Sequence, residues 1–260
     1  MARNSVIETM LNRKSIRSYK DEAPSDEKIE AIVRAGQQAP FASQLYSVLL
    51  SRKKGIPLGA PLLFTICLDV HKLELIMARR NWRFVMNDAD VLILGIQDAA
   101  LMAENMVIAA ESLGLGSCFL GAAPHMADRI ARDYRLPKRV FPLVQLTMGY
   151  PAEDPTPRPR YPMDFVLFED AYPELSDEVI GRAMKEMDEG YLAQDYYRGG
   201  KNMLPLEGNR EETYTFDNYG WTEHVSRKWG QWHPSSKEVL EQLSKRGFNI
   251  PGRERTDEKP

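Results

Sequence analysis

Five residues near the start of the chain, Arg13-Lys14-Ser15-Ile16-Arg17, combine three cations with a hydroxyl group. Arginine presents a planar fork of N–H donors that matches phosphate oxygens, and a serine hydroxyl can add a further hydrogen bond. The cluster therefore suits a phosphate clamp. A solvated face has the same composition. The pattern alone leaves both interpretations open.

A second basic pair lies far along the chain in the proline-rich stretch DPTPRPRYP, at Arg158 and Arg160. The neighbouring prolines favour an extended, stiff backbone, which would hold both guanidinium groups away from the chain. The same pattern is equally consistent with solvent-exposed linker charges.

Residue types that support other chemistries lack the necessary spacing. The histidines at positions 71, 125, 224 and 233 are not spaced as metal ligands, and the sequence contains neither GxSxG nor a Cys–His nucleophile arrangement. Cys67 and Cys118 are far apart with no CxxC. We therefore expect no metal site and no disulfide, and a reducing cytoplasm is the simplest location.

One stretch, residues 97–122, organises the elements that must position these groups. Residues 98–113 are good helix formers with apolar side chains nearly all round, which is typical of a helix buried in a core or an interface. Gly114 is expected to end this helix, and Gly116 and Gly121 follow within a short apolar segment. These glycines close a helix rather than open one, so they do not form a dinucleotide-binding fingerprint. They serve either packing or the close approach of a flat ligand.

The remaining pattern predicts helices and strands in mixed order. Apolar runs predict strands, and capping signals with 3–4 spacing predict helices. Helices are expected over residues 4–14, 25–36, 72–86 and 124–134, and strands over 47–52, 62–70 and 143–149.

The character of the chain changes near Tyr172. A helix capped by Ser176 precedes an aromatic stretch, residues 191–232, that has little periodicity and suits a strap lying across another surface. A capping box, Ser235-x-x-Glu238, begins a further helix. We therefore divide the chain into a core (1–171), a C-terminal extension (172–250) and a flexible tail (251–260).

Composition excludes several partner classes. The chain has 260 residues, 27% of them charged, a net charge of −3 and a pI near 5.9, which describes an ordinary globular protein and gives no reason to expect nucleic acid. No apolar run approaches the roughly 20 residues of a membrane span. The N-terminus is amphipathic and lacks the apolar centre of a secretory signal.

Taken in order, these segments resemble the nitroreductase-like flavoenzymes, and within them the larger oxygen-insensitive NADPH nitroreductases and flavin reductases. The resemblance covers about residues 1–250, and its motifs stand along the whole of that length. They are RKSIR at 13–17, APFASQLY at 39–46, GIQDAA at 95–100 with EN at 104–105, AESLGLG at 110–116, GYP at 149–151, RPRYP at 158–162 and DYYR at 195–198.

The resemblance implies an α+β fold, with a central, mostly antiparallel sheet wrapped by helices. It also implies an intertwined homodimer in which the C-terminal strap reaches over the partner subunit. FMN is expected to bind non-covalently at the interface, in sites built from both chains.

The resemblance implies a role for individual residues. Arg13, Ser15 and Arg17, with help from Lys14, are expected to hold the FMN phosphate and ribityl chain, and Arg158 and Arg160 to meet the phosphate and the pyrimidine end of the ring. The partner's loop would contribute its contacts through Ser43, Gln44 and Tyr46. The backbone along the ring face and N5 edge would be that of Phe119, Leu120, Gly121 and Ala122. Arg198 and Lys201 are candidates for binding NADPH.

Two positions depart from the family pattern. Tyr46 stands where the family loop usually has glutamine. The segment SRKKGIPLGAP, Ser51 to Pro61, is shorter than its family counterpart and lacks the Gly-Gln-x-Tyr piece that helps to floor the flavin pocket. What replaces that piece is left open by the sequence.

The resemblance implies an FMN-dependent NAD(P)H oxidoreductase that works by a ping-pong mechanism. The flavin N5 carries the chemistry, so no side chain is expected to act as a catalytic acid or base. The expected acceptors are small molecules: nitroaromatics, quinones or free flavin. Two alternatives remain: a dedicated dehydrogenase or reductase with a specialised substrate, and a flavin-sequestering protein without turnover.

Overall fold

The structure is a computed structural model that describes residues 4–231 and 236–250, and it divides into two compact units. Unit 1 comprises Met1–Pro155 and Ser235–Pro260, and unit 2 comprises Thr156–Pro234. The chain therefore leaves unit 1 once and returns to it near its end. The first change of unit, at 155/156, precedes the predicted start of the C-terminal extension at residue 172, and residues 236–250 of that predicted extension belong to unit 1.

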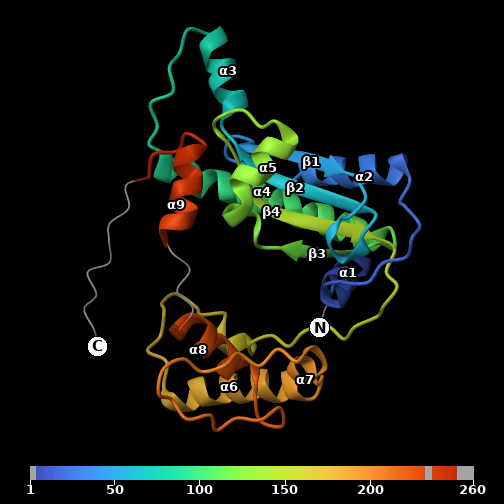
Figure 1. Cartoon of the computed structure of the whole chain (residues 1–260), viewed down its shortest axis with the longest axis vertical. Helices are drawn as coiled ribbons and strands as arrows, with labels where there is room; N and C mark the ends of the chain where they lie inside the picture. Colours follow the sequence, from blue (N-terminus) through green and yellow to red (C-terminus); the bar gives the residue numbers. More distant parts are fainter. Residues whose placement is uncertain (1–3, 232–235, 251–260) are drawn as a thin grey trace. The chain divides into compact units, whose positions relative to one another are not determined.

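Unit 1 is built on a four-stranded antiparallel sheet, drawn as arrows in Figure 1. Its strands are β1 (Tyr46–Ser51), β2 (Leu62–Asp69), β3 (Gly116–Leu120) and β4 (Val140–Gly149), in the spatial order β1-β2-β4-β3. All three pairings are antiparallel. Every residue of β2 is buried, because the sheet is covered on both faces. The expected α+β class is confirmed.

Helix α4 (Asp88–Ser112) is the central helix of unit 1 and packs with α2 (Asp26–Gln37) on one face of the sheet. Asn87 caps its first turn by accepting a hydrogen bond from Asp90 N, and Gly114, at φ +77°, follows its last turn as the sequence predicts. A Cβ on Gly36 of α2 would lie 2.6 Å from Cγ of Met106, so only glycine permits this approach of the two helices. The buried face of α4 comprises Val91, Ala99, Met102, Ala103, Met106, Val107 and Ala110.

By length and composition alone α4 could cross a membrane, which the expectation of no apolar span did not foresee. That expectation rested on uninterrupted apolar runs, whereas α4 spreads its apolar residues around a 25-residue helix. Many of them fill the core cluster between the sheet and α2. A core helix of this kind passes the same test of length and hydropathy.

The end of the chain belongs to unit 1. Helix α9 (Ser236–Lys245) and Phe248 pack with β2, α4 and α5 (Ala127–Tyr134) in a second core cluster, where Leu243 and Phe248 are buried. Arg246 donates hydrogen bonds to the carbonyl oxygens of Leu136 and Val140. Residues 236–250 therefore pack on unit 1 of their own chain.

Two short helices complete unit 1. Helix α1 (Ser5–Asn12) precedes the basic cluster, and α3 (His71–Arg79) follows β2. The sequence predicts α3 to run to residue 86, but it ends at Arg79 because Asn81 turns into the left-handed region at φ +60°.

Unit 2 contains α6 (Asp177–Leu192), α7 (Tyr196–Gly200) and α8 (Trp221–Gln231) around a cluster of aromatic rings. Ser176 caps α6 by accepting a hydrogen bond from Val179 N, as its sequence predicts. Tyr197 and Tyr219 are buried, and their rings meet edge to face at 5.3 Å. The predicted capping residue Ser235, Trp232 of the expected strap, His233 and the tail 251–260 lie outside the described residues.

Candidate functional site

The basic cluster lies along the β3 edge of the sheet. Ile16 N donates to Ser117 O at 2.9 Å, and Ser15 forms a parallel bridge with Ser117. A few residues later, Lys20 N donates to Tyr150 O at 2.9 Å, just after β4. Residues 13–20 therefore run as an added strand-like segment between the start of β3 and the end of β4.

Ile16 and Tyr19 fix this segment against the sheet. Ile16 is 2% exposed and sits so close to Gly116 that a Cβ there would lie 2.3 Å from its Cγ1. The Tyr19 hydroxyl donates to Ile16 O at 2.7 Å and lies 2.9 Å from Oγ1 of Thr147. Burial raises the pKa of Tyr19, so the phenol stays protonated. These contacts leave Arg13, Ser15 and Arg17 on the less buried side.

The cations of the cluster differ in their partners. Lys14 pairs with Asp154, and Glu153 Oε1 accepts hydrogen bonds from the backbone amides of Arg17 and Ser18. The Arg13 and Arg17 guanidinium groups form no ion pair or hydrogen bond with any other described residue. Glu111 of α4 lies near Arg13 and Lys14. Burial raises its pKa, and the two cations oppose that rise. Its Oε1 is buried without a hydrogen-bond partner among the described residues.

The segment that leaves β3 is exposed and open. Phe119 is 38% exposed, and Gly121 and Ala122 follow it in a turn. A Cβ on Gly121 would meet no heavy atom within 4 Å. At the other end of the strand, the hydroxyl of Ser117 is buried and has no hydrogen-bond partner in the described chain. This edge therefore offers free space beside a basic segment.

The short segment Ser51 to Pro61 packs beneath both site segments. It turns through η1 (Pro57–Gly59), with Leu58 at φ +62°. Its Ile56 and Ala60 form a small buried cluster with Leu63, against which Tyr19 and Leu120 pack. The shortened segment therefore supplies apolar support under the basic segment and the β3 exit.

The loop before β1 presents two of its three predicted contact residues. Ser43 and Gln44 are exposed, and Gln44 adopts φ +53°. Tyr46 is 7% exposed and belongs to the core cluster, where burial and the nearby Asp98 raise the pKa of its phenol. The Tyr46 side chain therefore packs in the core of unit 1.

In unit 2, the predicted basic pair is held by its neighbours. Arg158 donates to Oε1 of Gln194 at 2.6 Å, and its guanidinium lies over the Tyr196 ring, 4.0 Å from the centroid. Arg160 folds back to donate to the carbonyl oxygens of Arg158 and Pro159. The positions of these two guanidinium groups therefore depend on side-chain and carbonyl contacts as well as on the neighbouring prolines.

The two NADPH candidates have different surroundings. Arg198 pairs with Asp217 and lies 3.5 Å from Oδ1 of Asp195, so its charge is already balanced. Lys201 lines a hollow of about 390 Å³ whose wall also includes Tyr197 and His224.

A family model described as the nitroreductase family matches residues 10–54 and 51–150, which together are more than half of the chain. The chain belongs to the nitroreductase family. The matched residues include the basic segment, the loop before β1 and the β3 exit, and they stop before Arg158, Arg160 and Arg198.

Relatives extend this likeness over most of the nitroreductase chain. An FMN reductase (NADPH) of Bacillus subtilis is 31% identical over 229 residues, covering 82% of this chain and 89% of its own. An oxygen-insensitive NADPH nitroreductase of Salmonella typhimurium is 28% identical over 256 residues, covering 93% and 97%. The solved structure of NfrA2 of B. megaterium matches with a TM-score of 0.81 at 25% identity, covering 96% and 100%.

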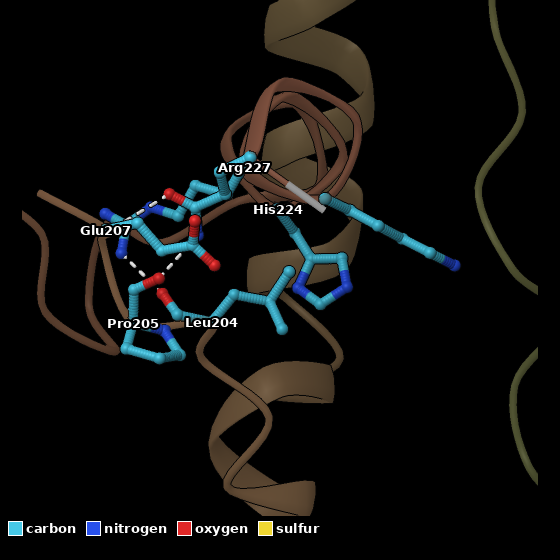
Figure 2. Close-up of a pocket in the computed structure, with 7 residues that line it drawn as sticks. Leu204, Pro205, Glu207, His224 and Arg227 are labelled. Carbon is cyan, nitrogen blue, oxygen red and sulfur yellow. Dashed lines mark hydrogen bonds between the residues drawn. The ribbon is translucent and has the colours of Figure 1, made fainter. Parts of the chain in front are cut away.

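Unit 2 of this nitroreductase also contains a cavity of about 350 Å³, shown in Figure 2. Arg227 lies in its wall and is 3% exposed. Its guanidinium group donates hydrogen bonds to Glu212, Glu223 and the Leu204 carbonyl oxygen. Burial and nearby cations lower the pKa of His224, which keeps this imidazole neutral. The arrangement holds the 204–212 segment to α8 and uses four of the five N–H donors of Arg227.

Sequence reasoning missed four polar residues of this nitroreductase that lie beside the site segments: Tyr19, Asp98, Glu111 and Ser117. Asp98 is the most buried carboxylate among them, at 1% exposure, and it contacts the loop before β1. A polar residue inside an otherwise apolar helix face is the signal that could have found Asp98 and Glu111.

Proposed function

We propose that this protein is an FMN-dependent NAD(P)H oxidoreductase that passes two electrons to nitroaromatics, quinones or free flavin. The proposal follows the family and the activities printed for two of its relatives, an FMN reductase (NADPH) and an oxygen-insensitive NADPH nitroreductase. NADPH is the favoured donor, with NADH as the alternative.

One observation in the structure supports the proposal above the others. The basic segment and β3, which lie about a hundred residues apart in the sequence, meet at one sheet edge through Ile16 N and Ser117 O near the start of the strand. The glycine-containing exit follows the other end of this five-residue strand. A candidate phosphate-binding group and an open surface for a flat ring therefore lie at the two ends of one short strand. FMN has both parts, a phosphate monoester and an isoalloxazine ring.

The residues at this edge fit FMN in charge and in space. The guanidinium groups of Arg13 and Arg17 form no ion pair or hydrogen bond with other described residues, which suits capture of a dianionic phosphate, and Lys14 and Ser15 add donors beside them. Gly121 has open space where any other residue would place a Cβ, which lets a ring approach the backbone. The ring face is assigned to Phe119, Leu120, Gly121 and Ala122.

The chain's own residues bind, orient and exclude water rather than exchange protons. Bound FMN supplies the redox chemistry, accepting hydride from NAD(P)H and releasing two electrons to the acceptor, in two successive half-reactions at one slot. The pocket must hold each reactant about 3–3.5 Å from the reacting atom. Cations near the pyrimidine end favour negative charge that develops there, and Arg160 is assigned this role.

For the unit 2 residues the assignment rests on the family resemblance. Arg158 and Arg160 are proposed as further ligands of FMN, and Arg198 and Lys201 as ligands of NADPH. Arg158 is held by Gln194 and Tyr196, so its donor group is already fixed before a ligand arrives.

We also propose a cytoplasmic homodimer in which each flavin site takes Ser43 and Gln44 from the partner. Exposed apolar side chains support a second copy of this chain as the partner. They lie on α1 at Val6, Met10 and Leu11, on α4 at Ile93, Ile96 and Leu101, and at Phe41. Surfaces of this kind mark interaction sites, and C2 dimers are the most common assembly.

The first test is the visible spectrum of the purified protein under anaerobic conditions, before and after addition of NADPH. We expect flavin bands that bleach and then return when a nitroaromatic or a quinone is added. Bands that bleach but return only with an untested acceptor would indicate a specialised substrate. Bands that never bleach would indicate a flavin-sequestering protein, and a colourless protein that takes up no added FMN contradicts the proposal.

The dimer is tested with mixed dimers carrying Arg17→Ala in one chain and Gln44→Ala in the other, purified through two different tags. If each site combines Arg17 of one chain with Gln44 of the other, one site of the mixed dimer carries both substitutions and the other carries neither. About half of the FMN should then bind with wild-type affinity. Two weakened sites, with no site of wild-type affinity, would show that both residues serve the same chain's flavin.

A further inference from the structure

Asp98 lies inside the apolar length of α4, yet its carboxylate is directed to backbone rather than to a cation. It is 1% exposed, and Oδ1 accepts a hydrogen bond from Ala42 N at 2.6 Å. Its Oδ2 accepts from Ser43 N at 3.1 Å and from Leu45 N at 2.9 Å. A buried carboxylate is costly unless such donors satisfy it, so these bonds tie the loop firmly to α4.

The anchored loop contains a residue with an unfavourable backbone conformation. Gln44 adopts φ +53°, a left-handed conformation that costs an L-residue with a Cβ about 1–2 kcal/mol. The amides of Ser43 and Leu45, which flank it, both donate to Asp98 Oδ2. The strain persists because the positions on both sides of Gln44 are fixed.

The hydrogen bonds to Asp98 also determine which groups of the loop face α4 and which are exposed. The amide groups of residues 42, 43 and 45 face α4, and Leu45 is buried at 3% exposure. The side chains of Ser43 and Gln44 remain exposed. The loop thus keeps its backbone inward and offers these two side chains outward in one conformation.

We propose that Asp98 is a positioning residue that preorganises residues 41–45 to contact the flavin. The inference rests on the proposed function, because it concerns the loop assigned to the isoalloxazine and ribityl groups of the partner's FMN. Asp98 itself touches no ligand. It removes the entropy that the loop would otherwise lose on binding, and so it lowers the dissociation constant for FMN.

The test is Asp98→Asn, compared with Asp88→Asn on the same helix. Asparagine keeps one acceptor oxygen but turns an NH₂ group toward backbone N–H donors, so at least one hydrogen bond is lost. Asp88 is also a paired carboxylate, bonded to Arg139 at 2.6 Å and to Asn249 N at 2.6 Å. It lies ten residues earlier on α4, about 15 Å along the helix axis, so its loss should affect folding but not the loop.

We expect Asp98→Asn to raise the FMN dissociation constant about tenfold or more. The visible circular dichroism of the flavin should change, and the amides of Ala42, Ser43 and Leu45 should exchange hydrogen faster. Asp88→Asn should keep wild-type affinity and a wild-type flavin spectrum even if its melting temperature falls. Equal FMN affinity and equal amide exchange in the two variants would overturn the inference.

A second pair of variants leaves Asp98 in place and does not threaten the fold, because Gln44 is exposed. Gln44→Val places a β-branched residue in the left-handed conformation. Gln44→Asn shortens the side chain to a similar length, but asparagine adopts that conformation readily. We expect the valine variant to bind FMN more weakly than the asparagine variant. Equal affinity would contradict a role for the held loop conformation.

The failure of this inference differs from the failure of the proposed function. A wild-type protein that binds no FMN overturns both. A wild-type protein that binds and turns over FMN, with an unaffected Asp98→Asn variant, overturns only the role of Asp98.

Discussion

The basic segment of unit 1 and two arginines of unit 2 are held in different ways. The segment is fixed through backbone groups and Ile16, while the Arg13 and Arg17 guanidinium groups form no ion pair or hydrogen bond in the described chain. In unit 2, Arg198 pairs with Asp195 and Asp217, and Arg227 with Glu212 and Glu223. The basic segment is positioned by its backbone and keeps two guanidinium groups unpaired, whereas Arg198 and Arg227 are neutralised by carboxylates.

This difference separates a ligand-binding cation from a structural one. A cation whose donors are unspent can give a full set of charge-assisted hydrogen bonds to a phosphate. A cation that already has carboxylate partners must first lose them, and the net gain is smaller. We therefore expect the basic segment of unit 1 to bind a phosphate more tightly than Arg198 of unit 2 does.

The largest expected effect tests the free cations of unit 1. Arg17→Ala should raise the FMN dissociation constant about 10- to 100-fold, because it removes a charge-assisted contact worth about 1.5–3 kcal/mol. Arg34→Ala is the matched control, since Arg34 is also an exposed arginine of unit 1 but pairs with Glu30 at 2.6 Å. Fluorescence titration of the apoprotein with FMN measures both. Equal affinity in the two variants would show that Arg17 does not bind the phosphate.

A smaller effect separates the two glycines of the β3 edge. Gly121→Ala should weaken FMN binding about tenfold at most without changing the melting temperature, because its Cβ meets nothing within 4 Å in the chain itself. Gly116→Ala should destabilise the protein by about 1–3 kcal/mol, because its Cβ would lie 2.3 Å from Ile16 Cγ1. Thermal unfolding and FMN titration of both variants test this. If Gly121→Ala lost stability and Gly116→Ala did not, Gly121 would be the packed position and Gly116 the open one, contrary to this prediction.

The sequence predicts the elements of unit 1 well, because its signals there are local. The Gly114 stop and the apolar run of β2 each follow from nearest neighbours and periodicity, whereas α4 begins at Asp88, ten residues before the expected start. The basic segment was also visible as a group. Its composition does not show that the segment lies along the β3 edge of the sheet. The hydrogen bond from Ile16 N to Ser117 O that holds it there joins residues about a hundred positions apart.

Other features depend on contacts that no local pattern contains. Tyr46 was assigned to the flavin because of its place in a motif, whereas its burial comes from the sheet and helices packed around it. The fold of the short segment after β1 follows from Ile56 and Ala60 meeting Leu63. The return of residues 236–250 to unit 1 depends on Leu243 and Phe248 filling a cluster built from distant elements.

A few-fold effect is expected where a unit 2 cation can be released. Asp217→Asn should lower the KM for NADPH by about two- to fivefold and leave the KM for NADH unchanged, because it frees Arg198 for the 2′-phosphate at the cost of an exposed ion pair worth about 0–1 kcal/mol. Asp164→Asn is the control, since Asp164 pairs with Arg182 in the same unit. Steady-state kinetics with both donors measures the effect. An equal change in the KM for NADH would show that Arg198 does not distinguish NADPH from NADH.

The smallest effect concerns the pH dependence of unit 2. The Arg227 hydrogen bonds hold the pKa of Glu212 at about 2, below its usual 4.5. Because the folded-state pKa is lowered, Glu212 stabilises the fold fully above pH 4.5, and this contribution is lost as the pH falls toward 2. Glu212→Gln should therefore unfold at lower urea than the wild type at pH 7, and the gap should narrow below pH 4.5.

The gap should be modest because 38% of the Glu212 side chain is exposed, where solvent screens the pair. Glu207→Gln, an exposed glutamate close to the same cavity, should match the wild type at every pH. Urea unfolding followed by tryptophan fluorescence, at intervals from pH 7 to pH 3, tests both variants. If the Glu212→Gln gap is the same at pH 3 as at pH 7, the charge of Glu212 does not hold Arg227. Glu223 and the Leu204 carbonyl would then suffice, and the contrast between paired and unpaired arginines would no longer explain the stability of unit 2.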